Sequence, residues 1–210
     1  MQSDESTLAE RVDESLLRAG FAQGDDYAAV LRTNLHSPVA RHRVLALRGA
    51  VRQRLVTSDD WRSALDDGEV TVRREALNQI AHAEIDDDVV FGALVHCLDD
   101  DDALVVDGAV FALGEHLYDG AVEKMCVIAT THDDARCRES AIAALGAIGD
   151  DRARPAILGA LDDKAPVRRR AIVALSNFEG PDVDAALARA SEDRDWQVRA
   201  AVNQLGRDDD

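Results

Sequence analysis

The stretch Asp134–Asp150, DARCRESAIAALGAIGD, decides the fold because degraded copies of it recur along most of the chain. With Leu145 as the reference, the equivalent residues stand 30–33 positions apart: Leu47, Ile80, Leu113, Leu175 and Leu205. A bulky aliphatic residue precedes each by three positions, and alanine precedes all but the first by four. In the first copy this alignment puts Arg43 at the alanine position. Residues at these offsets share one stripe of an α-helix, so the sequence predicts six copies of one amphipathic helix.

The period indicates that each copy is a helical hairpin. Two helices of four turns, joined by short loops, use about 30 residues, and one amphipathic helix cannot bury its stripe alone. We therefore predict an all-α fold, a right-handed α-α superhelix (solenoid) of about six hairpins. Residues 8–19 have helical spacing without the repeat signature, and Gly20 is a stop signal. Residues 1–24 are predicted to form a tail and a capping helix, and residues 25–210 a single repeat domain.

Aspartates recur between the two helices of a unit, as in Asp66-Asp67, Asp99–Asp102 and Asp133-Asp134. In the first unit, Ser37-Pro38 is predicted to begin the second helix. Side-chain oxygens at a helix start accept hydrogen bonds from free N–H groups and face the positive end of the helix dipole. Asp99–Asp102 lacks the ligand spacing and the closing glutamate of a calcium loop, so capping is the favoured interpretation.

The charge of the chain is strongly negative, at −17, with 30 Asp against 11 Glu and 22 Arg against 2 Lys. Such a surface repels itself unless salt screens it. This composition is typical of cytosolic proteins of salt-accumulating organisms, and it predicts a cytoplasmic protein of an extreme halophile. The chain has no apolar run of 18 residues and no secretory signal pattern. We expect no membrane partner, and the charge makes nucleic-acid binding unfavourable.

A family resemblance rests on Cys137–Asp150, which resembles the second helix of a HEAT-like repeat of the phycobilisome-lyase type, D-x-x-V-R-x-x-A-x-x-A-L-G-x-I-G-D. Residues 167–175 and 109–114 are similar, and weaker copies run from about residue 25 to residue 206. The resemblance implies an armadillo-type α-solenoid. It implies little about activity, because such repeats are general-purpose scaffolds.

Three activities known in this broad group can be compared with the residues present. The iron site of deoxyhypusine hydroxylase uses repeated His-Glu dipeptides, and the matching positions here hold Arg74-Glu75, Arg138-Glu139 and Arg169-Arg170. Without histidine, the imidazole ligands of such a site are missing. No residue pattern marks a bilin site. The basic face that an alkylbase DNA glycosylase needs conflicts with the net charge.

Arginines are the main candidate binding residues because they recur near the start of the repeated helix: Arg73, Arg74, Arg138, Arg168, Arg169 and Arg199. If the second helices line the concave surface of a solenoid, these residues form a basic strip. The strip could bind an acidic peptide, a carboxylate or a phosphate through bidentate contacts. In the alternative interpretation each arginine pairs with an inter-helix aspartate, such as Asp134, Asp163 or Asp195, and locks adjacent units.

Cysteines and histidines give no strong site. Cys126, His132 and Cys137 follow no standard zinc spacing, lack a fourth ligand, and include two cysteines at core-type positions. The sequence shows no nucleophile elbow, no phosphate-binding glycine loop and no grouping of Ser, His and Asp. We therefore predict no metal, no cofactor and no catalytic residue.

The function predicted from the sequence is a non-enzymatic scaffold or adaptor that binds a protein partner in its concave groove. One alternative is an enzyme or enzyme subunit, either a lyase-type chaperone of a cofactor-bearing protein or a degenerate relative of a metal-dependent hydroxylase. A second alternative is nucleic-acid binding through the arginine strip.

Overall fold

A computed structural model describes residues 2–22 and 24–205, with side chains from residue 11 onward. The regular structure in these residues is entirely helical. The chain forms two compact units, residues 1–93 and residues 94–210, which are described separately. The prediction of a single domain over residues 25–210 stays a prediction.

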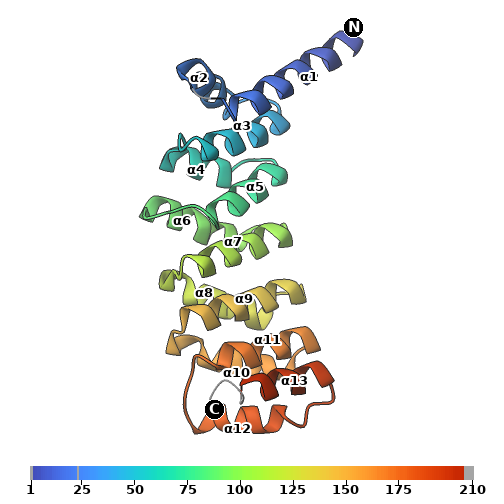
Figure 1. Cartoon of the computed structure of the whole chain (residues 1–210). Helices are drawn as coiled ribbons and strands as arrows, with labels where there is room; N and C mark the ends of the chain where they lie inside the picture. Colours follow the sequence, from blue (N-terminus) through green and yellow to red (C-terminus); the bar gives the residue numbers. More distant parts are fainter. Residues whose placement is uncertain (1, 23, 206–210) are drawn as a thin grey trace. The chain divides into compact units, whose positions relative to one another are not determined.

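The first unit contains α1 (Gln2–Ala19), α2 (Asp25–Asn34), α3 (Ala40–Arg52), α4 (Ser58–Leu65) and α5 (Val70–Ile80). Helix α6 (Asp88–His96) lies across the boundary between the units. Hairpins form from α2 with α3 and from α4 with α5, and α3 also packs on α5 (Figure 1). Helix α1 packs against α3 and α2, as predicted for a capping helix, and it extends through residues 2–7, which were predicted to be a tail.

The second unit contains α7 (Ala103–Glu115), α8 (Val122–Thr131), α9 (Ala135–Ile148), α10 (Arg154–Gly159), α11 (Ala165–Leu175), α12 (Pro181–Ala190) and α13 (Trp196–Leu205). Short 3-10 turns follow α6, precede α8 and flank α10: Cys97–Asp99, Asp119–Ala121, Asp151–Ala153 and Ala160–Asp162. The successive second helices α7, α9, α11 and α13 pack on one another, while α8, α10 and α12 each pair with the helix that follows (Figure 1). We call α3, α5, α7, α9, α11 and α13 the inner helices.

Repeated aliphatic side chains form the core, as predicted. Leu47, Ile80, Leu113, Leu145 and Leu175 are almost fully buried, and Leu205 is half-buried. The third residue of every inner helix is also buried: His42, Val72, Val105, Cys137, Val167 and Val198. Counting residues from the start of each inner helix therefore gives equivalent residues the same position number in all six copies.

This numbering corrects the predicted register of the first and last copies. Leu47 is the eighth residue of α3 and corresponds to Leu77 of α5, so the true equivalent of the reference leucine is Ala50. Alanine occupies its expected position in the first copy as Ala46, which is fully buried, and Arg43 is the fourth residue of its helix. The error arose because several small or aliphatic residues in α3 fit the stripe. Helix α3 also begins at Ala40, two residues after the predicted start.

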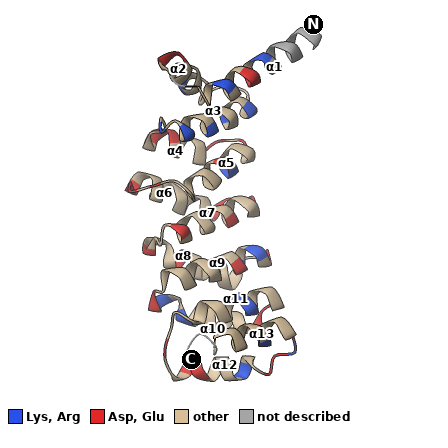
Figure 2. Cartoon of the chain, in the orientation of Figure 1, with Lys and Arg blue, Asp and Glu red and all other residues tan. Residues whose placement is uncertain are grey.

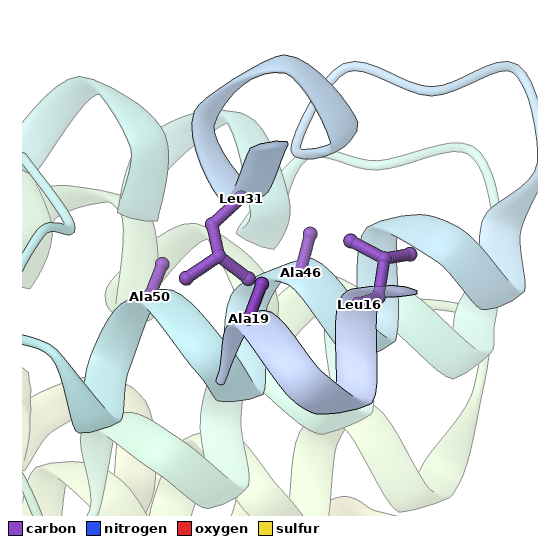
Figure 3. Close-up of a cluster of buried hydrophobic side chains, with 5 residues drawn as sticks. All are labelled: Leu16, Ala19, Leu31, Ala46 and Ala50. Carbon is purple, nitrogen blue, oxygen red and sulfur yellow. The ribbon is translucent and has the colours of Figure 1, made fainter. Parts of the chain in front are cut away.

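Buried side chains from three helices meet beneath the capping helix in the first unit. Figure 3 shows Leu16 and Ala19 of α1, Leu31 of α2, and Ala46 and Ala50 of α3 in one cluster. The α1–α3 approach is close, since a Cβ built on Gly49 would lie 3.1 Å from the Cα of Gly20 and 2.5 Å from a methyl of Leu31. Because Gly20 and Gly49 are small, α1 can pack on α3 as a preceding inner helix would.

Two glycines set the spacing of inner helices in the second unit. A Cβ added to Gly114 of α7 would lie 2.8 Å from the Cβ of Ala144 in α9. A Cβ added to Gly146 of α9 would lie 2.5 Å from the Cβ of Ala174 in α11. Any larger side chain at these glycines would force the helices apart, which explains the Leu-Gly pair of the repeat.

Candidate binding surface

Arg138 links two successive hairpins of the second unit. Its Nε and Nη2 each donate to a carboxylate oxygen of Asp163 at 2.7 Å, in a bidentate pair. Its Nη1 donates to the backbone carbonyl oxygen of His132 at 2.7 Å. One guanidinium group therefore ties the loop before α9 to the loop before α11, and bidentate geometry makes this among the stronger polar contacts a protein forms.

The same arrangement occurs twice more. Arg168 of α11 donates to both carboxylate oxygens of Asp193, at 2.9 and 2.8 Å. In the first unit, Arg43 of α3 donates to Asp67 at 2.7 and 2.6 Å. Both arginines also donate to a backbone carbonyl of the loop before their own helix. We call the pairs Arg43–Asp67, Arg138–Asp163 and Arg168–Asp193 the inter-hairpin clamps.

Two of the clamp aspartates, Asp163 and Asp193, are held in the ionised state. Hydrogen bonds from Arg138 keep the pKa of Asp163 below its ordinary value, and Arg168 does the same for the pKa of Asp193. Partial burial opposes both shifts without cancelling them. The charges at these positions are thus compensated within the protein.

The remaining four predicted arginines lie on α5, α11 and α13 and are not part of the clamps. Arg73 and Arg199 each donate to the carbonyl oxygen of a loop aspartate, Asp67 at 2.8 Å and Asp193 at 2.7 Å respectively. Arg199 is the fourth residue of α13 and Arg73 is the fourth residue of α5, so the two arginines occupy equivalent positions. Arg169 donates to Gln197 at 3.1 Å, and Arg74 is exposed.

The binding role of the six arginines stays a prediction. For Arg138 and Arg168 the geometry matches the alternative interpretation, pairing with loop aspartates. Asp163 was among the expected partners, and Asp193 takes the place of Asp195. The glutamates that match the hydroxylase motif are also paired. Glu75 accepts from Arg48 at 2.5 Å, and Glu139 accepts from Arg170 at 3.4 Å.

A hollow of about 320 Å³ lies on the inner helices of the second unit. Its walls come from α7, α9 and α11: Phe111, Gly114, Glu115, Glu139, Ser140, Ala143, Ala144, Ala147 and Arg170. Phe111 is 48% exposed, a large value for an aromatic ring, and it stands beside a floor of alanines. We call this hollow the α7–α9 groove.

Packing and polar contacts hold the groove in shape. The Gly114–Ala144 contact fixes the approach of α7 to α9, and Ser140 and Asp107 join the same helices through a 2.5 Å hydrogen bond. Larger hollows of about 440 and 460 Å³ occur in the first unit, but loop residues such as Phe21 and Ile85 form much of their walls. The α7–α9 groove is lined by helices alone, so its side chains are positioned more rigidly.

The sequence contains a signal for this surface that the repeat analysis missed. Residues 75–123 include 13 Asp and Glu but no Lys or Arg. Within the second unit, residues 94–123 carry eight of these acids without a single basic residue. Figure 2 shows α7 without blue segments, in contrast to α9 and α11. One wall of the groove therefore belongs to the most acidic part of the chain.

A grouping of Ser, His and Asp does occur in the first unit, contrary to the sequence analysis. The Oγ of Ser37 lies 3.3 Å from Nδ1 of His42, and Nε2 of His42 lies 3.6 Å from Oδ1 of Asp13 in α1. The serine oxygen also accepts the backbone N–H of Val39 at 3.2 Å, and His42 is buried. Together with the ion pair between Nε of Arg41 and Oδ2 of Asp13 at 2.7 Å, these contacts join α1 to α3.

The cysteines and histidine considered for metal binding contact separate groups. Cys137 is buried and donates to the carbonyl oxygen of Ala103 at 3.1 Å, and burial raises the pKa of its thiol to about 11. His132 accepts the backbone N–H of Asp134 through Nδ1 at 3.1 Å. Among the described side chains, those of residues 11–22 and 24–205, no three His, Cys, Asp or Glu are grouped as metal ligands would be. Of the helices in this part of the chain, none has the length and apolar character to cross a membrane.

Comparison with known proteins agrees with the repeat architecture. Residues 122–206 match a sequence profile of HEAT repeats. The Escherichia coli protein YibA is similar in structure, with a TM-score of 0.62, 19% identity, and coverage of 94% of this chain and 72% of YibA. A designed armadillo repeat protein in complex with the peptide (KR)4 has a TM-score of 0.58, 17% identity, and coverage of 93% and 98%.

The phycocyanin lyase complex of CpcE and CpcF from Nostoc sp. is also similar, with a TM-score of 0.59, 21% identity, and coverage of 86% of this chain and 75% of the matched chain. No curated protein matches the sequence. At these identities the structural similarities establish the fold alone. The predicted resemblance to HEAT-like repeats and the all-α solenoid fold are confirmed.

Proposed function

We propose that this protein is a non-enzymatic, cytoplasmic adaptor that binds a protein partner in the α7–α9 groove. The main observation in support of this proposal is the groove itself, an open hollow of about 320 Å³ on packed inner helices with a half-exposed Phe111 at its wall. Exposed aromatic side chains beside shallow apolar pockets are the usual anchors of protein interfaces. The structurally similar designed armadillo protein in complex with a peptide supports the proposal.

The mechanism is recognition by a preformed surface. Helices α7, α9 and α11 are held by glycine–alanine contacts and by the Arg138–Asp163 clamp, so little order has to be gained on binding. A surface that is rigid before binding loses less conformational entropy and retains more of its contact energy. Packing contacts and short-range polar contacts also persist at high ionic strength, where long-range attraction is screened.

A photocrosslinking experiment tests the proposal. A benzoylphenylalanine at Ala143 places the reactive group in the groove, and one at Val127 of α8, which is 58% exposed, serves as the control. In extracts of the source organism, the residue-143 variant is expected to form a discrete adduct with a partner, and Phe111→Ala should abolish it. Equal adducts from both variants, or an adduct insensitive to Phe111→Ala, would contradict the role of the groove.

A further inference from the structure

The α7–α9 groove combines an apolar floor with two carboxylates, Glu115 of α7 and Glu139 of α9, and one basic side chain, Arg170 of α11. Ala143 and Ala147 of α9 form the floor beside the ring of Phe111. Glu115, the last residue of α7, is exposed at the edge, and its side chain forms no hydrogen bond or ion pair with the described residues. Glu139, the second carboxylate, lies 3.4 Å from Arg170 and is partly neutralised by it.

A cation is favoured near Glu115 for three reasons. Its carboxylate is an exposed, uncompensated negative charge, in contrast to Glu139. It stands at the C-terminal end of α7, where the helix dipole is negative. Residues 94–123, the sequence around Glu115, contain seven further acids and no Lys or Arg. A cationic group at this edge thus meets negative potential from the side chain and the helix, in an acid-rich stretch of the chain.

A long basic side chain matches both parts of the groove. Lysine and arginine carry an aliphatic stem that packs on apolar surface while the charged head stays in water. In the groove, the stem would lie on Ala143 and Ala147 and the head would reach Glu115. The face of Phe111 adds a cation–π contact, which favours arginine or lysine over an uncharged residue.

We propose that the partner of the α7–α9 groove presents a basic segment, whose arginine or lysine side chain packs against Phe111 and pairs with Glu115. This inference rests on the proposed adaptor function and specifies the chemistry of its partner. An acidic partner is disfavoured because Glu115 repels it and because Arg170, the basic residue among the groove-lining side chains, already pairs with Glu139.

Fluorescence anisotropy with defined peptides tests the inference. The probe is a labelled octapeptide of alternating Lys and Arg, and its matched control has acetyl-lysine and citrulline at the same positions. The basic peptide is expected to bind and the neutral peptide to bind at least about tenfold more weakly, because only the former supplies charge. Equal binding of the two peptides, or no binding of the basic one, overturns the inference.

Matched variants separate the groove from diffuse attraction. Glu115→Gln and Glu192→Gln remove the same charge from the second unit, but Glu192 is exposed beyond α12, outside the groove. Glu115→Gln should lower the affinity for the basic peptide about two- to fivefold, and Glu192→Gln should leave that affinity unchanged. Phe111→Ala should weaken the binding of the basic peptide at least about fivefold, whereas Val127→Ala should not change it. Equal losses for the two glutamate variants would contradict specific binding at the groove.

The two proposals can fail separately. If the basic peptide does not bind but the photocrosslinker at residue 143 captures a partner in a Phe111-dependent way, the adaptor function stands and the basic chemistry is wrong. If neither binds at the groove, both fall. Melting curves of all variants verify that each loss of binding occurs in a folded protein.

Discussion

Two junctions between inner helices in the second unit share their packing and differ in their loops. The α7–α9 and α9–α11 junctions each press a glycine onto an alanine, Gly114 on Ala144 and Gly146 on Ala174. At the α9–α11 junction the loops are joined by the Arg138–Asp163 clamp. At the α7–α9 junction the position equivalent to Arg138 is Val106, the fourth residue of α7.

The loop residue at the α7–α9 junction changes along with the helix residue. His132 occupies the place of the clamp aspartate, since its Nδ1 accepts the N–H two residues on, just as Oδ1 of Asp193 accepts from Asp195. The close packing of helices is therefore the constant element of the repeat, and the charged clamp is an addition. The unclamped junction is also where the α7–α9 groove opens, next to a wall without basic residues.

The largest expected effect comes from a charge placed in the shared packing. Ala141 of α9 is fully buried, and Ala147 on the same helix is exposed. Ala141→Glu should lower the free energy of unfolding by about 3–5 kcal/mol or prevent folding, because it buries an unpaired charge. Ala147→Glu should leave the thermal midpoint nearly unchanged. Similar melting curves for the two variants would show that the register of α9 is wrong.

The next effect tests the glycine contacts of the two junctions against each other. Gly146→Ala should lower the free energy of unfolding by about 1–2 kcal/mol, since overpacking outweighs the gain in helix propensity. Gly114→Ala should cost less, because its Cβ would be 2.8 Å rather than 2.5 Å from the neighbouring alanine. Gly159→Ala in α10, where no atom lies within 4 Å of the new Cβ, should stabilise by up to about 1 kcal/mol. Chemical denaturation of the three variants measures their free energies of unfolding. A reversed ranking of these values would refute the role given to the glycine contacts.

A smaller effect is expected where α7 and α9 end. Leu117, just beyond α7, has a φ of 50°, and Gly149, beyond α9, has a φ of 70°. Only glycine adopts this left-handed conformation without strain. Leu117→Gly should therefore stabilise the protein by about 0.5–1 kcal/mol, since Leu117 is exposed and loses little packing. Gly149→Leu should destabilise the protein by a similar amount. If calorimetry found both substitutions neutral, the result would contradict backbone strain for leucine at these two positions.

The smallest effect concerns the exposed aspartate that begins α9. Hydrogen bonds, first from the Arg136 side chain and then from its backbone N–H, lower the pKa of Asp134 to about 2. Because the folded pKa lies below the ordinary value of 3.8, the stabilising contribution is present above pH 3.8 and is lost as the pH falls through about 2. Carboxyl NMR titration should give a pKa near 2 in the wild type and a higher one in Arg136→Gln. An unchanged value would exclude Arg136 as the cause.

Much of the fold follows from local sequence. Asp134 caps the start of α9, as predicted for the inter-helix aspartates, and Ala141, Ile142 and Leu145 form the predicted buried stripe. The register of α3 was predicted three residues off, since Ala46, Leu47 and Ala50 all suit a buried stripe. Only the helix start at Ala40, which depends on tertiary packing, distinguishes the alternatives.

The candidate surface was less predictable than the fold. One of the two interpretations of the arginines named Asp163 as a possible partner, but the sequence did not show that Arg138 is the residue that contacts it. The α7–α9 groove depends on how closely three helices approach, and a single sequence does not report that distance. The contact of His42 with Asp13 links residues 29 positions apart through the docking of α1, which lacks the repeat pattern. The acid-only interval of residues 75–123 was readable in the sequence but needs the structure to place it beside Phe111.

A double-mutant cycle on the Arg138–Asp163 clamp, run beside Val106→Arg with His132→Asp, tests most directly whether successive hairpins repeat one register. In the first cycle, Arg138→Met and Asp163→Asn should each destabilise and should show a coupling energy of about 1–3 kcal/mol. In the second, Val106→Arg alone should destabilise and His132→Asp should restore part of the loss, because the pair recreates the clamp. Additive effects in both cycles would contradict the shared register and leave the arginines available for a ligand.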